Sequence, residues 1–258
     1  MESLVIYQVE DRIAEITINR PEKRNALNPA LVAELTAAFL KAQNDANVKV
    51  VVLKANGDVF SAGADLAYMQ QLQGFSYEEN IQDSTSLKNL FETIRTLPKV
   101  VIAQVEGHAI AGGCGLATIC DIVFAVPEAK FGYTEVKLGF VPAIVSCYLI
   151  QKVGETLAKK LLLSGDLFTA EEALKYNLIT DVTKSDEINQ IVREFALNLT
   201  NNASGNSLAL TKQLINQTTN TWLDSCLDNA IKVNAKTRES DDFKKGISSF
   251  LAKERINW

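Results

Sequence analysis

The sequence predicts an α/β protein in which similar strand and turn units stack on one another, followed by an all-helical segment. The β-branched runs at 49–52 and 99–102 open two segments that align in register. In that alignment Gly57 matches Gly107, and Gly63 matches Gly113. A strand and turn unit that recurs at a fixed period is typical of stacked, solenoid-like turns. We therefore expect two equivalent Gly-rich turns to lie side by side.

The N-terminal part alternates strands and helices. Apolar patterning predicts a hairpin from 3–9 and 12–19, and a polar, basic loop follows at 20–25. Asn28 before Pro29 is a helix start, and helical spacing continues to about Asn44. The remaining elements expected here are a strand at 48–54, a Gly-containing turn at 59–66 with a short helix to 73, and a helix at 77–97 before Pro98.

The spacing of apolar residues in the second half of the chain predicts mostly helices. Helical spacing covers 144–153 and 155–164 with Gly154 between them, a capping box at Thr169 opens a helix to 176, and a strand at 178–182 precedes a helix at 185–199. The polar segment 201–206 is the best linker, and helices are expected at 207–217, 221–237 and 240–253. The division is thus an α/β body at 1–200 and a helical region at 201–258.

Composition excludes several function classes. The 258 residues carry a net charge of −5, which gives no overall attraction to nucleic acid or to an anionic membrane. The N-terminus reads as neither signal peptide nor transit peptide, and we expect a cytoplasmic protein. Four cysteines lack metal-ligand spacing and are expected to be free thiols in a reducing compartment, so no metal site is predicted: Cys114, Cys120, Cys147 and Cys226.

The stretch 99–139 carries the chemistry. A strand-like run leads into the small-residue turn at Gly112 and Gly113, and an apolar helical segment follows at once. Glycine lets backbone N–H groups approach a ligand closely, so such a turn can hold an oxyanion. Glu135 follows in a second strand-like run, where a carboxylate among apolar neighbours can move a proton near neutral pH. Together these features indicate thioester or ester chemistry.

Simpler interpretations stand beside these. Glycines at a turn are more often structural than anion-binding, and a lone carboxylate such as Glu135 is more often a surface or salt-bridge residue. His108, the single histidine, could pair with Cys114 as a nucleophile, but a structural role is favoured. The loop at 20–24 could be a solvated charge run, and Trp222 and Trp258 are expected to pack in the helical region or at a subunit contact.

Four motifs in order and spacing make the chain similar to the crotonase (enoyl-CoA hydratase/isomerase) superfamily: RPEKRNALN at 20–28, FSAGADL at 60–66, AGGCGLATICDIVFA at 111–125 and FGYTEVKLG at 131–139. The resemblance spans nearly the whole chain. It implies a spiral of ββα repeats with a C-terminal helical region that packs trimers, often paired into hexamers. It also implies that the N–H groups of Ala64 and Gly112 form the oxyanion hole for a thioester carbonyl.

The sequence departs from the hydratase pattern at one of its two glutamates. The first position is Gly115, whereas the second, Glu135, is present. The sequence at 136–155 resembles that of the methylglutaconyl-CoA hydratase branch, in which glycine also occurs at the first position. The resemblance therefore implies a lyase that adds water to, or removes it from, an enoyl-CoA, with 3-methylglutaconyl-CoA as the first candidate substrate. An enoyl-CoA isomerase using Glu135 alone and a glutaconyl-type decarboxylase remain alternatives, as does a CoA-binding scaffold without activity.

The resemblance implies an acyl-CoA ligand and no separate cofactor. Local positive charge at Arg20, Lys23 and Arg24 suits the phosphates of coenzyme A. The family pattern places five residues around the nucleotide and pantetheine, and two in the last helix over the adenine: Arg24, Ala26, Ala62, Asp65 and Leu66, then Phe250 and Lys253. For a carboxylate on the acyl chain, the candidates are Lys137, Tyr133 and Arg95.

Overall fold

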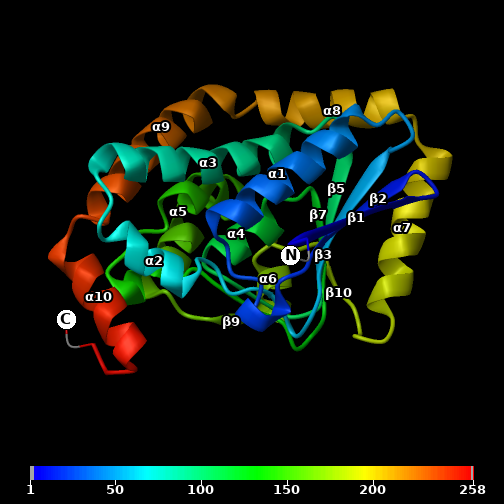
Figure 1. The fold of residues 1–258 in the computed structure, drawn as a ribbon. Coiled ribbons are helices and arrows are strands. Elements are labelled where there is room, and N and C mark those ends of the chain that lie inside the picture. Colours follow the sequence, from blue (N-terminus) through cyan, green and yellow to red (C-terminus); the bar gives the residue numbers. More distant parts are fainter. Residues whose placement is uncertain (1–2, 257) are drawn as a thin grey trace.

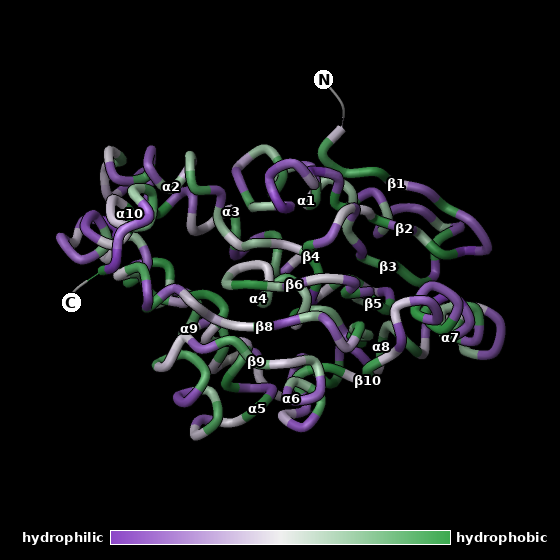
Figure 2. Tube along the Cα trace, turned by 90° about the horizontal axis from the view of Figure 1, so that it is seen from below, coloured by the Kyte–Doolittle hydropathy of each residue, from purple (hydrophilic) through white to green (hydrophobic). Residues whose placement is uncertain are grey.

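The computed structural model describes residues 3–256 and 258, which form two sheets enclosed by helices (Figure 1). One sheet has six strands in the order β1 (Val5–Glu10), β2 (Ile13–Ile18), β3 (Val50–Ala55), β5 (Val100–Val105), β7 (Ile122–Ala125) and β10 (Asp181–Val182). The other has four, in the order β4 (Val59–Ser61), β6 (His108–Ile110), β8 (Lys130–Gly132) and β9 (Phe168–Thr169). Figure 2 shows β4, β6, β8 and β9 side by side.

Successive turns of the chain give one strand to each sheet, which makes a spiral of repeated units. β3, β5 and β7 pair in parallel in the large sheet, while β4, β6 and β8 pair in parallel in the small one. Val50 pairs with Val100 and Val52 with Ile102, which is the register given by aligning the two β-branched runs. The predicted stacking of the two units is therefore confirmed.

Most helices begin and end close to the predicted positions. The predicted linker at 201–206 is the exception, because helices cover 188–202 and 205–217 and leave only Ala203 and Ser204 between them. Asn28 caps α1 by accepting a hydrogen bond from the Leu31 amide, with Pro29 at the first helical position. Two short 3-10 helices and ten α-helices are described: η1 (Pro21–Lys23), η2 (Glu135–Leu138), α1 (Pro29–Asn44), α2 (Leu66–Leu72), α3 (Tyr77–Thr96), α4 (Gly112–Thr118), α5 (Ala143–Ser164), α6 (Ala170–Lys175), α7 (Ile188–Asn202), α8 (Gly205–Gln217), α9 (Asn220–Thr237) and α10 (Asp241–Ala252). None of the helices so described is both long and apolar enough to cross a membrane.

Two local expectations have different outcomes. Gly154 interrupts α5 with φ 76° and ψ 165°, so the predicted break between two helical stretches is confirmed. Glu135 does not lie in a strand, and that prediction is wrong. β8 ends at Gly132, and the Lys137 amide donates to the Thr134 carbonyl in a tight turn, which begins η2 at Glu135.

The expectation of four free thiols is also wrong. Cys147 of α5 and Cys226 of α9 form a disulfide, while Cys114 and Cys120 are free and buried. The two bonded cysteines are 79 residues apart in sequence and meet because α9 packs along α5, so their spacing in the chain carries no signal.

The C-terminal helices pack onto the α/β body. Leu223 and Leu227 of α9 belong to the main hydrophobic core. Phe243 and Ile247 of α10 form a second, smaller cluster with Met69 of α2. α10 thereby packs against α2 (Figure 1) and against η2. Both segments contribute residues to the cleft described next.

Candidate active site

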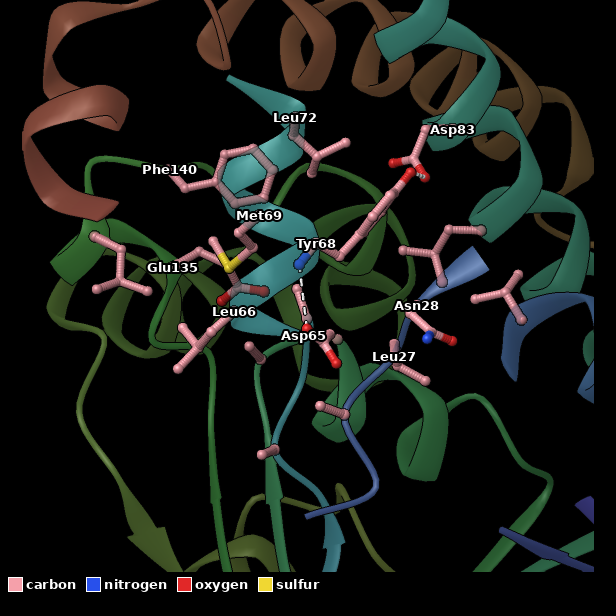
Figure 3. A pocket seen from close by; sticks show the side chains of 18 of the residues that line it. Leu27, Asn28, Asp65, Leu66, Tyr68, Met69, Leu72, Asp83, Glu135 and Phe140 are labelled. Atoms are coloured by element: carbon pink, nitrogen blue, oxygen red, sulfur yellow. Dashed lines mark hydrogen bonds between the residues drawn. The ribbon is translucent and has the colours of Figure 1, made fainter. Parts of the chain in front are cut away.

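A deep cleft of about 1770 Å³ opens between the ends of the small sheet, α2, α3 and the C-terminal segment. It is bordered by nearly all the residues expected to form the oxyanion hole, to move a proton or to bind coenzyme A. Figure 3 shows Asp65, Leu66 and Glu135 among them. Those lining it are Arg24, Ala26, Ala62, Ala64, Asp65, Leu66, Gly112, Glu135 and Phe250. Lys253 is not among the lining residues.

The backbone around Ala64 makes hydrogen bonds to the segment at Leu27 on one side only. Leu27 and Ala64 form an isolated parallel bridge, in which the Leu27 amide donates to the Gly63 carbonyl and the Asp65 amide donates to the Leu27 carbonyl. In an extended chain successive N–H groups point to opposite sides. The N–H of Ala64 therefore points away from Leu27, and it has no backbone acceptor among the described residues.

Gly112 begins α4 directly beside this segment. A Cβ added to Gly63 would lie 3.5 Å from the Gly112 nitrogen and 2.9 Å from the Ala111 Cβ, so the two turns are in contact. As the first residue of a helix, Gly112 has an amide without an intrahelical acceptor. Ala111 before it has φ 51° and ψ −125°, a strained conformation of the kind that gathers at functional sites. The amides of Ala64 and Gly112, neither of which has an acceptor among the described residues, thus border one cleft from neighbouring turns of the spiral.

Glu135 is the buried carboxyl group in the wall of the cleft. The residue is 8% exposed, and its Oε2 has no hydrogen-bond partner among the described residues. Burial away from water raises the pKa of Glu135 from 4.5 to about 7, against a smaller lowering by its own backbone amide. Figure 3 shows this carboxyl group beside Met69 and Leu66. It can therefore accept or donate a proton near neutral pH.

Gly115 has no room for a side chain. A Cβ at this position would lie 2.3 Å from Val145 Cγ1 and 3.0 Å from Phe91 Cε2. Gly115 is buried in α4 and does not line the cleft, whereas Val145 does. The position at which the family resemblance leads us to expect a first glutamate is therefore filled by apolar groups.

Asp65 holds the loop that carries Ala64. Its Oδ1 caps α2 by accepting from the Ala67 and Tyr68 amides, and its Oδ2 lies 2.5 Å from Arg20 Nη1. Burial works to raise the pKa of Asp65, but the hydrogen bond from Arg20 and those two amides hold it below the ordinary value. Arg20 also donates to the Ala26 carbonyl and is not among the lining residues. Its role here is structural.

Of the three residues expected to bind a carboxylate on the acyl chain, only one lies in the cleft. Lys137 lines the cleft and is half-exposed, paired with Asp166. Tyr133 and Arg95 are buried outside the cleft, where Tyr133 contacts Thr118 and Arg95 binds Glu92. They are therefore not positioned to bind an acyl group.

The Cys–His alternative is not supported. His108 is exposed at the cleft, and its Nδ1 accepts from the Lys130 amide. Cys114 is fully buried, which raises the pKa of its thiol to about 12. A thiol that stays protonated is a poor nucleophile.

Sequence reasoning missed a polar group on the far wall of the cleft. Tyr68 Oη donates to Asp83 Oδ1 over 2.6 Å, and Arg238 Nη1 lies 2.7 Å from Asp83 Oδ2. All three residues line the cleft. They come from α2, α3 and the end of α9, and no motif links them in the sequence.

Comparison with known proteins agrees with this geometry. The family model for enoyl-CoA hydratase/isomerase matches residues 8–258. A Thermus thermophilus protein named as a candidate enoyl-CoA hydratase is 41% identical over 96% of this chain and 98% of its own. The 2,3-dehydroadipyl-CoA hydratase of Escherichia coli is 34% identical over 97% of this chain and 96% of its own.

Solved structures share the fold. The crystal structure of an enoyl-CoA hydratase from Mycobacterium avium superposes with a TM-score of 0.88 at 31% identity, covering 100% of both chains. The family match, the related sequences and the shared spiral all lead to one assignment. The chain belongs to the enoyl-CoA hydratase/isomerase family of the crotonase superfamily.

Proposed function

We propose that the protein hydrates a conjugated enoyl-CoA thioester, with the N–H groups of Ala64 and Gly112 as the oxyanion hole and Glu135 as the single acid and base. The observation that carries the proposal is the meeting, in one cleft, of two amides and one buried carboxyl group: neither amide has an acceptor, and the Oε2 atom of Glu135 has no partner, within the part of the chain that the structure describes. Such groups in a family of enoyl-CoA enzymes support thioester chemistry.

One carboxylate is sufficient for the addition of water. Ionised Glu135 accepts a proton from water as the water oxygen bonds to the β-carbon. The double-bond electrons move onto the thioester oxygen, where two preorganised N–H donors stabilise the enolate more than the neutral carbonyl. The enolate then takes the proton from Glu135 at the α-carbon, which restores the carboxylate. The amide donors are each worth about two to three decades in rate.

Isomerisation of the double bond is the second candidate. It needs one carboxylate to carry a proton between two carbons of the same enolate, and Gly115 and Val145 leave the cleft with no second glutamate at that position. The decarboxylase alternative gains no observation of its own from the cleft.

Coenzyme A is proposed to enter along the mouth of the cleft. Lys23 and Arg24 are exposed there and can meet phosphate groups, while Ala26, Ala62 and Leu66 offer small or apolar contacts to pantetheine. Phe250 is 46% exposed at the mouth and can cover the adenine. No cofactor beyond the thioester itself enters the proposal.

For the acyl group, 3-methylglutaconyl-CoA remains the first candidate. The likeness to a hydratase of 2,3-dehydroadipyl-CoA, whose acyl chain also ends in a carboxylate, supports the same chemical class.

Assembly into a trimer or hexamer is likewise a proposal. Three apolar side chains on α8 are at least half exposed, which supports a subunit contact on that helix: Leu210, Leu214 and Ile215. Light scattering of the purified protein gives its mass directly, and a monomer at micromolar concentration would contradict the proposal.

The test is turnover of a panel of enoyl-CoA thioesters by the wild type and by Glu135→Gln. Hydration adds the mass of one water, whereas isomerisation leaves the mass unchanged. We expect Glu135→Gln to lower kcat/KM by about two to four decades, because a general acid and base contributes that much. In the wild type, kcat/KM should rise with pH through about 7 and then stay level, since the ionised carboxylate starts the reaction. Wild-type rates in Glu135→Gln would refute the role of this residue.

A further inference from the structure

Arg238, which follows the last residue of α9, is a buried arginine in the wall of the cleft. Its side chain is 7% exposed. Nη1 lies 2.7 Å from Asp83 Oδ2 and donates to Asn80 Oδ1 over 3.1 Å. Nε is buried and has no hydrogen-bond partner among the described residues. A buried donor without an acceptor is costly, so this side of the guanidinium needs an acceptor from elsewhere.

Asp83 does not accept a hydrogen bond from this nitrogen in the structure. Its Oδ2 is held by Arg238 Nη1, and its Oδ1 accepts from the hydroxyl of Tyr68. Burial, followed by the bond to Asp83, raises the pKa of Tyr68, so its hydroxyl stays protonated and keeps donating. Tyr68 and Asp83 therefore fix Arg238 by one nitrogen, and the edge formed by Nε and Nη2 remains unused within the described part of the chain.

An apolar path joins this group to Glu135. The Phe140 amide donates to the Glu135 carbonyl over 3.1 Å, and the Phe140 ring centroid lies 5.6 Å from Arg238 Cζ. Met69 and Leu72 also line this part of the cleft. Figure 3 shows Phe140 and Met69 on the side of Glu135, and Tyr68 directed across the cleft to Asp83 on α3. An acyl chain held at Glu135 can follow these apolar side chains toward Arg238.

We propose that the free Nε and Nη2 edge of Arg238 binds a carboxylate at the far end of the acyl chain, so that Arg238 selects enoyl-CoA substrates of the dicarboxylic class. This inference rests on the proposed function, since it takes the cleft as the acyl-CoA site. Two parallel N–H groups on one edge of a guanidinium match the two oxygens of a carboxylate. The positive charge of Arg238 is already balanced by Asp83, so the selection depends on this pair of hydrogen bonds and not on excess charge.

Binding of unreactive, saturated thioesters tests the inference without any turnover. Calorimetry compares two pairs of equal chain length, glutaryl-CoA with valeryl-CoA and adipyl-CoA with hexanoyl-CoA. For the wild type we expect the carboxylate member of at least one pair to bind about tenfold to a hundredfold more tightly. Arg238→Lys keeps a cation beside Asp83 but lacks the two-donor edge, so its ratio should fall to near one.

Arg95→Lys is the matched control. Arg95 is similarly buried and bound to Glu92, but it lies outside the cleft, so its substitution should leave the ratio as in the wild type. If Arg238→Lys does not fold, the double variant Asp83→Asn/Arg238→Gln removes both charges together and should show the same loss of preference. Equal binding within both pairs by the wild type, or an unchanged preference in the Arg238 variants, would overturn the inference. Failure of the proposed function would show separately, as absent turnover of every enoyl-CoA.

Discussion

Val145 occupies the space that a side chain at position 115 would need, because its Cγ1 lies 2.3 Å from the point where a Cβ of Gly115 would stand. Phe91 closes the same space from α3 at 3.0 Å. The glycine is thus part of how α4 packs against α5 and α3, and the apolar packing explains why a carboxylate cannot be restored there by one substitution.

Gly115→Ala should destabilise the protein. Alanine has the better helix propensity by about 1 kcal/mol, but the methyl group would overlap Val145 and Phe91, and overpacking of a core costs about 1–3 kcal/mol. We expect urea denaturation to show a lower free energy of unfolding. Val145→Ala in the same chain should recover part of the loss. The control is Gly74→Ala, whose Cβ would meet nothing nearer than the Gln71 carbonyl at 3.6 Å. Equal stability of Gly115→Ala and the wild type would show that α5 moves freely.

Glu135→Gln should be more stable than the wild type at high pH. The pKa of Glu135 is raised from 4.5 to about 7 in the folded protein, so the folded state favours the neutral form, and stability falls as pH rises between these two values. At about 1.4 kcal/mol for each pH unit, the cost above pH 7 is roughly 3 kcal/mol. Glutamine does not ionise and avoids it.

The measurement is the free energy of unfolding of both proteins from pH 4 to pH 9. This range extends beyond the two pKa values of Glu135, 4.5 in the unfolded chain and about 7 in the folded protein. The difference between the two proteins should grow between about pH 4.5 and pH 7 and be constant beyond both ends. Glu15→Gln is the control, since Glu15 is partly exposed on β2 beside Lys54. A difference that does not change with pH would mean that Glu135 is not desolvated.

Arg24→Ala should weaken the binding of coenzyme A thioesters. Loss of hydrogen bonds from a guanidinium to phosphate costs about tenfold in affinity, and the loss should shrink at high salt. A pantetheine thioester lacks the nucleotide phosphates and should bind both proteins alike. Lys232→Ala removes an exposed cation outside the cleft and should leave the affinity for both ligands as it is. Equal loss with both ligands would remove Arg24 from the phosphate site.

Patterns in the sequence predicted those features that depend on residues close together in the chain, such as strand register and helix ends. The β-branched runs at 50–52 and 100–102 gave the register of β3 and β5, because strands buried on both faces need such residues. Asn28, Thr169 and Gly154 marked helix ends and a break through capping and backbone conformation.

Contacts between distant helices lie beyond such patterns. The Arg238 and Asp83 pair, the Cys147 and Cys226 disulfide, and the packing of Val145 on Gly115 all depend on how α3, α4, α5 and α9 lie against one another. The position of Glu135 in η2 was missed for a similar reason. Its neighbours alternate as in a strand, whereas the turn that begins at Thr134 sets its conformation.

Gly246 of α10 lets the last helix rest on the segment that carries Glu135. A Cβ at this position would lie 2.1 Å from the Leu138 carbonyl oxygen and 2.4 Å from its carbon, which are backbone atoms of η2. Gly246→Ala must therefore push α10 and η2 apart. We expect kcat/KM to fall by at least about tenfold, because small displacements of a catalytic group are costly.

A second measurement separates this effect from simple loss of stability. If η2 moves and water reaches Glu135, the pKa seen in the pH dependence of kcat/KM should drop below about 7, since burial is the main cause of its elevation. Gly205→Ala is the matched control, because its Cβ at the start of α8 would meet only the Lys49 side chain at 3.6 Å. A Gly246→Ala protein with the wild-type pH profile and rate would show that α10 does not position Glu135.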